Sequence, residues 1–215
     1  MQIFFCQNAQ PLPADVWAEN IARMPPLARA GILRYVRWSD RQATFFGRLL
    51  LLRAFGLEGR PDVLDRVTWN DYQRPSLTGF PDFNISHSGN WVVLAVSEEG
   101  PVGIDVEQMS AVRLRDFRSI LCPEEWRLLH TLEDPADLFF SIWTKKEAVC
   151  KAEGRGLYNA LDTVNALGNQ VFLEGRLWYL RDVPVGAGYA CHLASDRAID
   201  TFSLEEVPAV ELAGK

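Results

Sequence analysis

The chain has 215 residues, of which 48% are hydrophobic, and 22 Lys and Arg against 28 Asp and Glu give a formal net charge of -6. This much apolar surface can build a core, which excludes disorder as the main state. The acidic balance and the absence of a basic block exclude a non-specific nucleic-acid binder, because such binding rests on neutralising phosphates. The length fits one large domain or two small ones.

The sequence predicts a protein that crosses no membrane. Its most apolar stretch, residues 45–57, is interrupted by Gly and Arg and falls short of the roughly 20 apolar residues of a membrane span. The first residues lack the basic start and the apolar run of a secretory signal. The four Cys residues lie far apart without a C-x-x-C pair, so we expect reduced thiols, neither zinc nor a disulfide framework, and a cytosolic chain.

The first half of the chain begins with helical patterns. Apolar spacing predicts helices over residues 14–23 and 27–37, and Ser39-Asp40 is an N-cap signal for a longer helix that ends at Gly56. Short strands are predicted afterwards, at residues 67–69, 83–85, 91–97 and 102–107. The turn at residues 98–101 indicates that the last two form a hairpin.

The second half repeats this order of elements. Residues 113–154 are helical in pattern, with Pro123 opening one helix and Asp137 preceding another. Strands are then predicted at residues 164–167, 171–173, 177–180, 188–193 and 201–204. Helices followed by strands in each half predict an α+β architecture of two similar halves, residues 1–102 and 103–215.

Two carboxylates stand side by side in the predicted strand at residues 102–107. Side chains of a strand alternate between its faces, so Asp105 and Glu107 share the face opposite Val102, Ile104 and Val106. Oxygen ligands at this spacing suit Mg²⁺, which takes one or two carboxylates and completes its shell with water and phosphate oxygens. A solvated strand face explains the same pattern, so the motif needs a partner.

A third carboxylate lies on a predicted helix. Phe139, Trp143, Glu147 and Lys151 recur every four residues and therefore share one stripe, which begins apolar and ends in a Glu–Lys pair. A carboxylate drawn toward the interior is costly unless a cation meets it. The alternative is a helix-supporting pair worth a few tenths of a kcal/mol. We favour the functional interpretation, because Glu147 would complete a metal site with Asp105 and Glu107.

Two further segments offer groups for an anion. Residues 84–89, expected to form a turn, carry the hydroxyls of Ser86 and Ser88, the imidazole of His87 and amides beside Gly89. A second turn, at residues 72–75, carries Arg74. The alternative for both is an ordinary surface turn.

These motifs together resemble the 4′-phosphopantetheinyl transferases of the surfactin-synthetase (Sfp) type, over nearly the whole chain. The specific elements are residues 103–107, residues 143–148 with Lys151, and residues 83–88, and weaker support comes from residues 40–53 and Arg74-Pro75. The resemblance implies transfer of phosphopantetheine from coenzyme A to a serine of an apo acyl, peptidyl or polyketide carrier protein, with release of adenosine 3′,5′-bisphosphate. It also implies a pseudo-dimer of two α+β halves with coenzyme A in the cleft between them, and we expect a monomer.

The resemblance also implies roles for individual residues. Asp105, Glu107 and Glu147 would hold Mg²⁺, and Lys151 and His87 would bind phosphate oxygens. Ser86, Thr44 and Arg74 would help to hold the nucleotide. Glu125 matches an additional glutamate of the family, a candidate base for the carrier serine, although an acid in the first turn of a helix is favoured by the dipole anyway.

One departure from the family concerns the 3′-phosphate. Many members place lysines in the segment that corresponds to residues 28–31, where this chain has only Arg29. Arg34, Arg37 and Arg41 lie nearby and could replace them. Two other functions stay open: a non-catalytic module that binds carrier proteins, and a Mg²⁺-dependent phosphohydrolase in which water replaces the serine.

Overall fold

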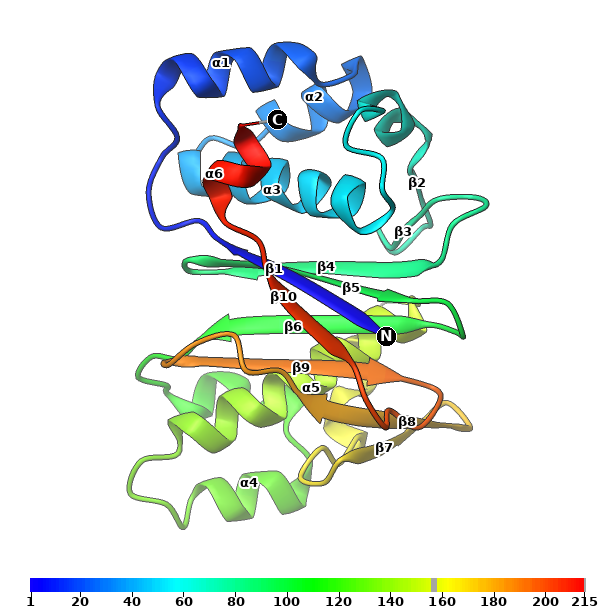
Figure 1. The fold of residues 1–215 in the computed structure, drawn as a ribbon. Helices are drawn as coiled ribbons and strands as arrows, with labels where there is room; N and C mark the ends of the chain where they lie inside the picture. The colour runs from blue at the N-terminus through cyan, green and yellow to red at the C-terminus, as the bar shows by residue number, and fades with distance from the viewer. Residues whose placement is uncertain (156–157, 215) are drawn as a thin grey trace.

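The structure, a computed structural model, describes residues 1–155 and 158–214 as two lobes stacked through their sheets (Figure 1). The first sheet has strand order β10-β1-β5-β4 and the second has β6-β9-β8-β7. A small ribbon of β2 and β3 lies beside the first sheet. The strands are β1 (Gln2–Gln7), β2 (Thr68–Trp69), β3 (Pro75–Ser76), β4 (Asp82–Ser88), β5 (Trp91–Ser97), β6 (Val102–Gln108), β7 (Gln170–Leu173), β8 (Arg176–Asp182), β9 (Tyr189–Ser195) and β10 (Ser203–Glu206).

Helices cover the outer face of each sheet, which gives four layers (Figure 1). The first sheet carries α1 (Ala14–Arg23), α2 (Pro26–Leu33), α3 (Trp38–Ala54) and α6 (Ala209–Ala213), with the 3-10 helix η1 (Pro61–Arg66) beside them. The second sheet carries α4 (Pro123–Leu129) and α5 (Ala136–Glu153), with the 3-10 helices η2 (Leu114–Ile120) and η3 (Tyr158–Thr163). The α+β class predicted from the sequence is confirmed.

Three hydrophobic cores hold these layers together. One lies between the first sheet and its helices, one between the two sheets, and one between the second sheet and α4 and α5. The side chains of β1 alternate between two cores. Phe4 and Cys6 enter the first core, whereas Ile3 and Phe5 enter the middle one. The two lobes therefore share an apolar interface.

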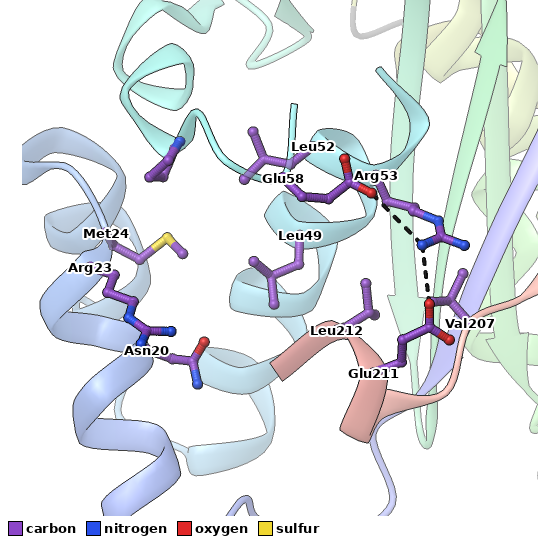
Figure 2. A pocket seen from close by; sticks show the side chains of 11 residues that line it. Asn20, Arg23, Met24, Leu49, Leu52, Arg53, Glu58, Val207, Glu211 and Leu212 are labelled. Carbon is purple, nitrogen blue, oxygen red and sulfur yellow. Dashed lines mark hydrogen bonds and ion pairs between the residues drawn. The ribbon is translucent and has the colours of Figure 1, made fainter. Parts of the chain in front are cut away.

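The end of the chain returns to the first lobe. Strand β10 pairs in parallel with β1, and α6 packs near α3, where Arg53 meets Glu205 and Glu211. Figure 2 shows Arg53 between Glu58 and Glu211 at the rim of a cavity of about 70 Å³. The domain division at residues 102 and 103 stays a prediction, with residues 203–213 crossing back onto the first lobe.

Several predicted elements differ from the structure. The predicted hairpin of residues 91–97 and 102–107 is wrong, because β5 pairs with β1 and β4 while β6 pairs with β9 in the other sheet. The real hairpin joins β4 to β5 through Gly89-Asn90, and the positive φ of Gly89 suits that tight turn. Residues 86–88, predicted only as a turn, consequently continue strand β4, which includes the predicted strand at residues 83–85.

Other boundaries move less. Helix α1 has the predicted bounds, whereas the helix predicted over residues 27–37 ends at Leu33. Residues 164–167, predicted as a strand, are irregular. In the part of the chain that the structure describes, no helix is both long and apolar enough to span a membrane.

Candidate functional site

The predicted acids lie on β6 and α5, two elements that approach each other closely beside β4. Gly103 of β6 makes this approach possible, because a Cβ there would lie 2.0 Å from the carbonyl oxygen of Ala148 in α5. The alternation of β6 is as predicted, with Val102, Ile104 and Val106 in the middle core. The opposite face of β6, which carries the carboxylates, is therefore pressed against the helix.

Asp105 and Lys151 form the centre of the site. Lys151 Nζ lies 2.6 Å from Asp105 Oδ1 and donates to Ser86 Oγ at 2.9 Å, while Ser86 donates to the same carboxylate oxygen at 3.0 Å. The other oxygen, Asp105 Oδ2, is buried and accepts no hydrogen bond from any described residue. A buried carboxylate oxygen without a donor is costly, so this atom fits a bound cation.

The electrostatics of Lys151 favour its charged form. Burial opposes the charge, but the attraction of Asp105, Glu147 and Glu107 together outweighs it and raises the pKa of the ammonium group. The Lys151 side chain is 29% exposed, against 5% for Asp105. A permanent cation with access to solvent can bind a phosphate oxygen.

Glu107 lies at the next position on the same face of β6. Its Oε2 accepts a hydrogen bond of 2.7 Å from Ser88 Oγ. Burial is the largest cause that raises the pKa of the Glu107 carboxyl, followed among the raising causes by the charge of Asp105, whereas the hydrogen bonds from Ser88 and Trp143 lower it. The two neighbouring carboxylates therefore repel each other unless a cation lies between them.

Glu147 is buried on α5, one turn before Lys151, and its charge is one of those that stabilise the Lys151 cation. Among residues 1–155 and 158–214, no three His, Cys, Asp or Glu side chains form a group ready to hold a metal. The three-acid metal site thus stays a prediction. The donor chemistry still suits Mg²⁺, which needs only one or two carboxylates when phosphates and water supply the rest.

Arg74 is committed to other groups. It forms a two-pronged ion pair with Asp82, and it donates to the backbone carbonyls of Lys151 and Val102. The guanidinium therefore ties the β2–β3 ribbon to α5 and β6. A cavity of about 200 Å³ lies at this junction, lined by Arg74, Lys151 and Glu147 together with Tyr72, Gln73, Pro75, Asn84, Ile85, Cys150 and Gly154.

The remaining predicted nucleotide contacts lie on the helical side of β4. His87 points away from Ser86 by strand alternation, and loss of hydration and the Lys151 charge lower its pKa while Asp40 of α3 opposes this. Thr44 donates to the Asp40 carbonyl one turn earlier in α3, and Arg41 donates to the Tyr35 carbonyl. Arg41 and Thr44 are half-buried on α3.

Glu125 lies outside this group, inside the C-terminal lobe. Its side chain is fully buried, and it accepts hydrogen bonds from Lys146 Nζ at 2.6 Å and from the backbone N–H groups of Cys122 and Ala166 at 2.9 and 2.8 Å. Both carboxylate oxygens are therefore used. The role of Glu125 as a base stays a prediction, and its enclosure argues against it.

The sequence analysis missed two sets of polar residues. Asp82 contacts β6 and was not assigned, and Ser88, interpreted only as a group for an anion, contacts Glu107 of β6 instead. The alternation of polar residues at 82, 84, 86 and 88 could have indicated a shared face. The second set lies behind α5, where the buried His192 lies 2.6 Å from Thr144 Oγ1 and 2.6 Å from the exposed Asp182. Burial lowers the pKa of His192 to about 4, so its ring is neutral at neutral pH.

Several known proteins are similar to this chain in sequence. Residues 101–176 match the family described as the 4′-phosphopantetheinyl transferase superfamily. The 4′-phosphopantetheinyl transferase Sfp of Bacillus subtilis (strain 168) is 29% identical over 76% of this chain and 75% of that protein. A 4′-phosphopantetheinyl transferase of Bacillus subtilis is 30% identical over the same shares. A solved holo-acyl-carrier-protein synthase of Thermotoga maritima covers 44% of this chain and 61% of its own, with 22% identity and a TM-score of 0.34.

Proposed function

The chain belongs to the 4′-phosphopantetheinyl transferase superfamily, and we propose that it transfers the 4′-phosphopantetheine group of coenzyme A to a serine of an apo carrier protein. The serine oxygen attacks the phosphorus that bears pantetheine. A new phosphoester bond forms as the pyrophosphate P–O bond breaks, and adenosine 3′,5′-bisphosphate leaves with the bonding electrons. The serine proton passes to a base or to water.

The observation that carries this proposal is the group formed by Asp105, Ser86 and Lys151 at the joint of the lobes. It combines a partly open ammonium with a buried carboxylate oxygen that has no donor among the described residues. During attack on a pyrophosphate, negative charge on its oxygens is stabilised by a fixed cationic side chain together with a bound cation. The cavity beside Arg74 and Lys151 offers space for the nucleotide at this point.

The residues divide the work of binding. Lys151 faces the phosphate oxygens, and His87 donates a hydrogen bond as a neutral ring, because its lowered pKa disfavours the imidazolium. Asp105, Glu107 and Glu147 would hold Mg²⁺, which when bound supplies charge neutralisation at the pyrophosphate. Arg74 keeps α5 and β6 together through backbone contacts. Thr44 and Arg41 of α3 face the nucleotide from the other lobe.

The proposal extends to assembly and compartment. One chain supplies β4, β6 and α5, so a second copy is not needed to complete the site, and we infer a monomer. The four cysteines are free and buried, which suits the reducing cytosol.

The test is to incubate the protein with coenzyme A, Mg²⁺ and a panel of apo carrier proteins and to weigh the intact products. A carrier heavier by one phosphopantetheine group supports transfer. Bisphosphate released without carrier would identify a hydrolase instead, and carrier binding without a mass change would identify a non-catalytic module.

A matched substitution tests the metal acids. Glu147→Gln keeps the size of the side chain and removes its charge, so turnover should fall about 100-fold, or about 2.7 kcal/mol, with the fold retained. Near-normal rates of Glu147→Gln at limiting Mg²⁺ would contradict the three-acid site.

A further inference from the structure

The joint between the lobes is made by two edge strands. β4 ends the first sheet and β6 begins the second, so each has one side without a neighbour in its own sheet. The free backbone N–H groups of an edge strand need partners, or they invite pairing with another chain. β4 and β6 solve this without forming a ladder between their backbones.

The side chains of β4 supply these partners in a regular series. Every second residue of β4 accepts a hydrogen bond from the N–H of every second residue of β6. The four contacts are Asp82 Oδ2 with Val102 N at 2.8 Å, Asn84 Oδ1 with Ile104 N at 3.0 Å, Ser86 Oγ with Val106 N at 3.4 Å, and Ser88 Oγ with Gln108 N at 3.1 Å. The two strands therefore run parallel in one fixed register.

The two serines of this series do more than accept. A hydroxyl has one proton to donate while its lone pairs accept, so each serine can serve two groups at once. Ser86 gives its proton to Asp105 Oδ1 and Ser88 gives its proton to Glu107 Oε2, at 3.0 and 2.7 Å. Each hydroxyl is oriented by the β6 backbone and in turn orients a β6 carboxylate.

This arrangement limits what the serines can do for a substrate. The proton of Ser86 is engaged by Asp105, and its lone pairs face Lys151 and Val106. Ser86 and Ser88 thus act on the acids of the site rather than on phosphate.

We propose that Ser88 is a positioning residue for the transfer reaction, because its hydrogen bond fixes the orientation of the Glu107 carboxylate that would hold Mg²⁺. This inference rests on the proposed function, because it concerns the metal of that reaction. Ser88 belongs to the first lobe and Glu107 to the second, so a residue of one lobe would orient a metal ligand of the other. Removing a residue that hydrogen-bonds to a metal ligand typically lowers metal affinity by about 10-fold to 100-fold.

The competing explanation is that Ser88 only locks the lobes. That role would be seen in unfolding stability and not in metal binding. The two roles are therefore separated by measuring Mg²⁺ affinity and stability on the same variants.

The experiment compares Ser88→Ala with two matched variants. Ser88→Thr keeps the hydroxyl. Ser97→Ala makes the same chemical change at a buried serine of β5 whose hydroxyl accepts only the N–H of Glu99 in the described structure. Mg²⁺ is titrated by calorimetry into each protein saturated with coenzyme A, and urea unfolding and the Mg²⁺ dependence of transfer are measured in parallel.

We expect Ser88→Ala to weaken Mg²⁺ binding about 10-fold or more, Ser88→Thr to restore it, and Ser97→Ala to leave it unchanged. Unchanged Mg²⁺ affinity in Ser88→Ala, or a loss of stability alone, would overturn the proposal. Failure of Ser88→Thr to restore binding would also overturn it, because the hydroxyl would not be the cause. If the unsubstituted protein transfers nothing to any carrier, the proposed function fails, while calorimetry still decides the effect of Ser88 on Mg²⁺.

Discussion

Helix α5 carries two lysines that each meet a carboxylate, and the surroundings of the two pairs differ. Lys146 and Glu125 are both fully enclosed, and the ammonium also donates to the carbonyls of Ile120 and Leu161. Lys151 is 29% exposed, and its partner Asp105 keeps one oxygen without a donor from the described residues. A pair with every hydrogen bond satisfied has nothing left to offer a ligand.

The difference shows how one helix can serve both stability and binding. Lys146 donates to three acceptors, which lie in η2, α4 and η3. Its partner Glu125 also accepts the N–H of Ala166 and so holds that loop. Lys151 faces the joint between the lobes, where its side chain is partly open to solvent. Similar pairs in the sequence thus acquire different functions from the side of the helix on which they lie.

The largest expected effect is on the enclosed pair. Lys146→Ala leaves Glu125 buried without its cation, which should cost about 3 to 5 kcal/mol of unfolding free energy. Urea denaturation measures this loss. The control is Arg127→Ala, which removes an exposed pair with Glu124 and should change stability by less than about 1 kcal/mol. Equal losses of stability in the two variants would contradict the difference between an enclosed and an exposed ion pair.

Lys151→Ala should act mainly on catalysis. If Lys151 binds the transferring phosphate as we propose, removing its charge should lower kcat/KM about 10²-fold to 10³-fold. Stability should fall less than in Lys146→Ala, because Ser86 and water still contact Asp105. Steady-state rates and melting curves of the same preparation test this, and a large stability loss with unchanged activity per folded molecule would favour a structural role.

Glu125→Gln tests whether the enclosed carboxylate is a base. The amide group would bring an N–H₂ toward the N–H of Cys122 or Ala166, which should cost about 1 to 3 kcal/mol of stability. Activity per folded molecule should stay close to that of the unsubstituted chain. A slower transfer rate with intact stability and unchanged coenzyme A affinity would restore the catalytic interpretation.

The smallest effect is expected at three arginines of the first lobe, of which Arg34 and Arg37 are exposed and Arg41 is half-buried. The unsubstituted chain should prefer coenzyme A to 3′-dephospho-coenzyme A. This preference should shrink by about tenfold or less, which is 1.4 kcal/mol, in Arg34→Ala, Arg37→Ala or Arg41→Ala. Arg29→Ala serves as the comparison variant. The guanidinium of Arg29 is already engaged, because it donates to the carbonyls of Ala22 and Met24 at the end of α1. The ratio of kcat/KM for the two donors is the measurement, and a ratio near one would show that the chain does not use the 3′-phosphate.

The sequence determined those features that depend on local periodicity. The α1 helix, the α5 stripe and the two-faced alternation of β6 follow from side-chain spacing, and the motifs at residues 103–107 and 143–148 indicated the family before any fold was known. Three-dimensional context was not needed for these, because a helix or strand repeats with its own fixed period.

Tertiary structure alone decided which strands pair and which polar groups face each other. The prediction that β5 and β6 form a hairpin is wrong, because the sequence of a short turn does not determine the sheet to which the next strand belongs. Arg74 is bound to Asp82 and backbone carbonyls, Glu125 is enclosed with Lys146, and Ser88 reaches Glu107 across the two lobes. Each of these contacts joins residues from different elements, and the free energy of such a contact depends on packing and burial that no local pattern contains.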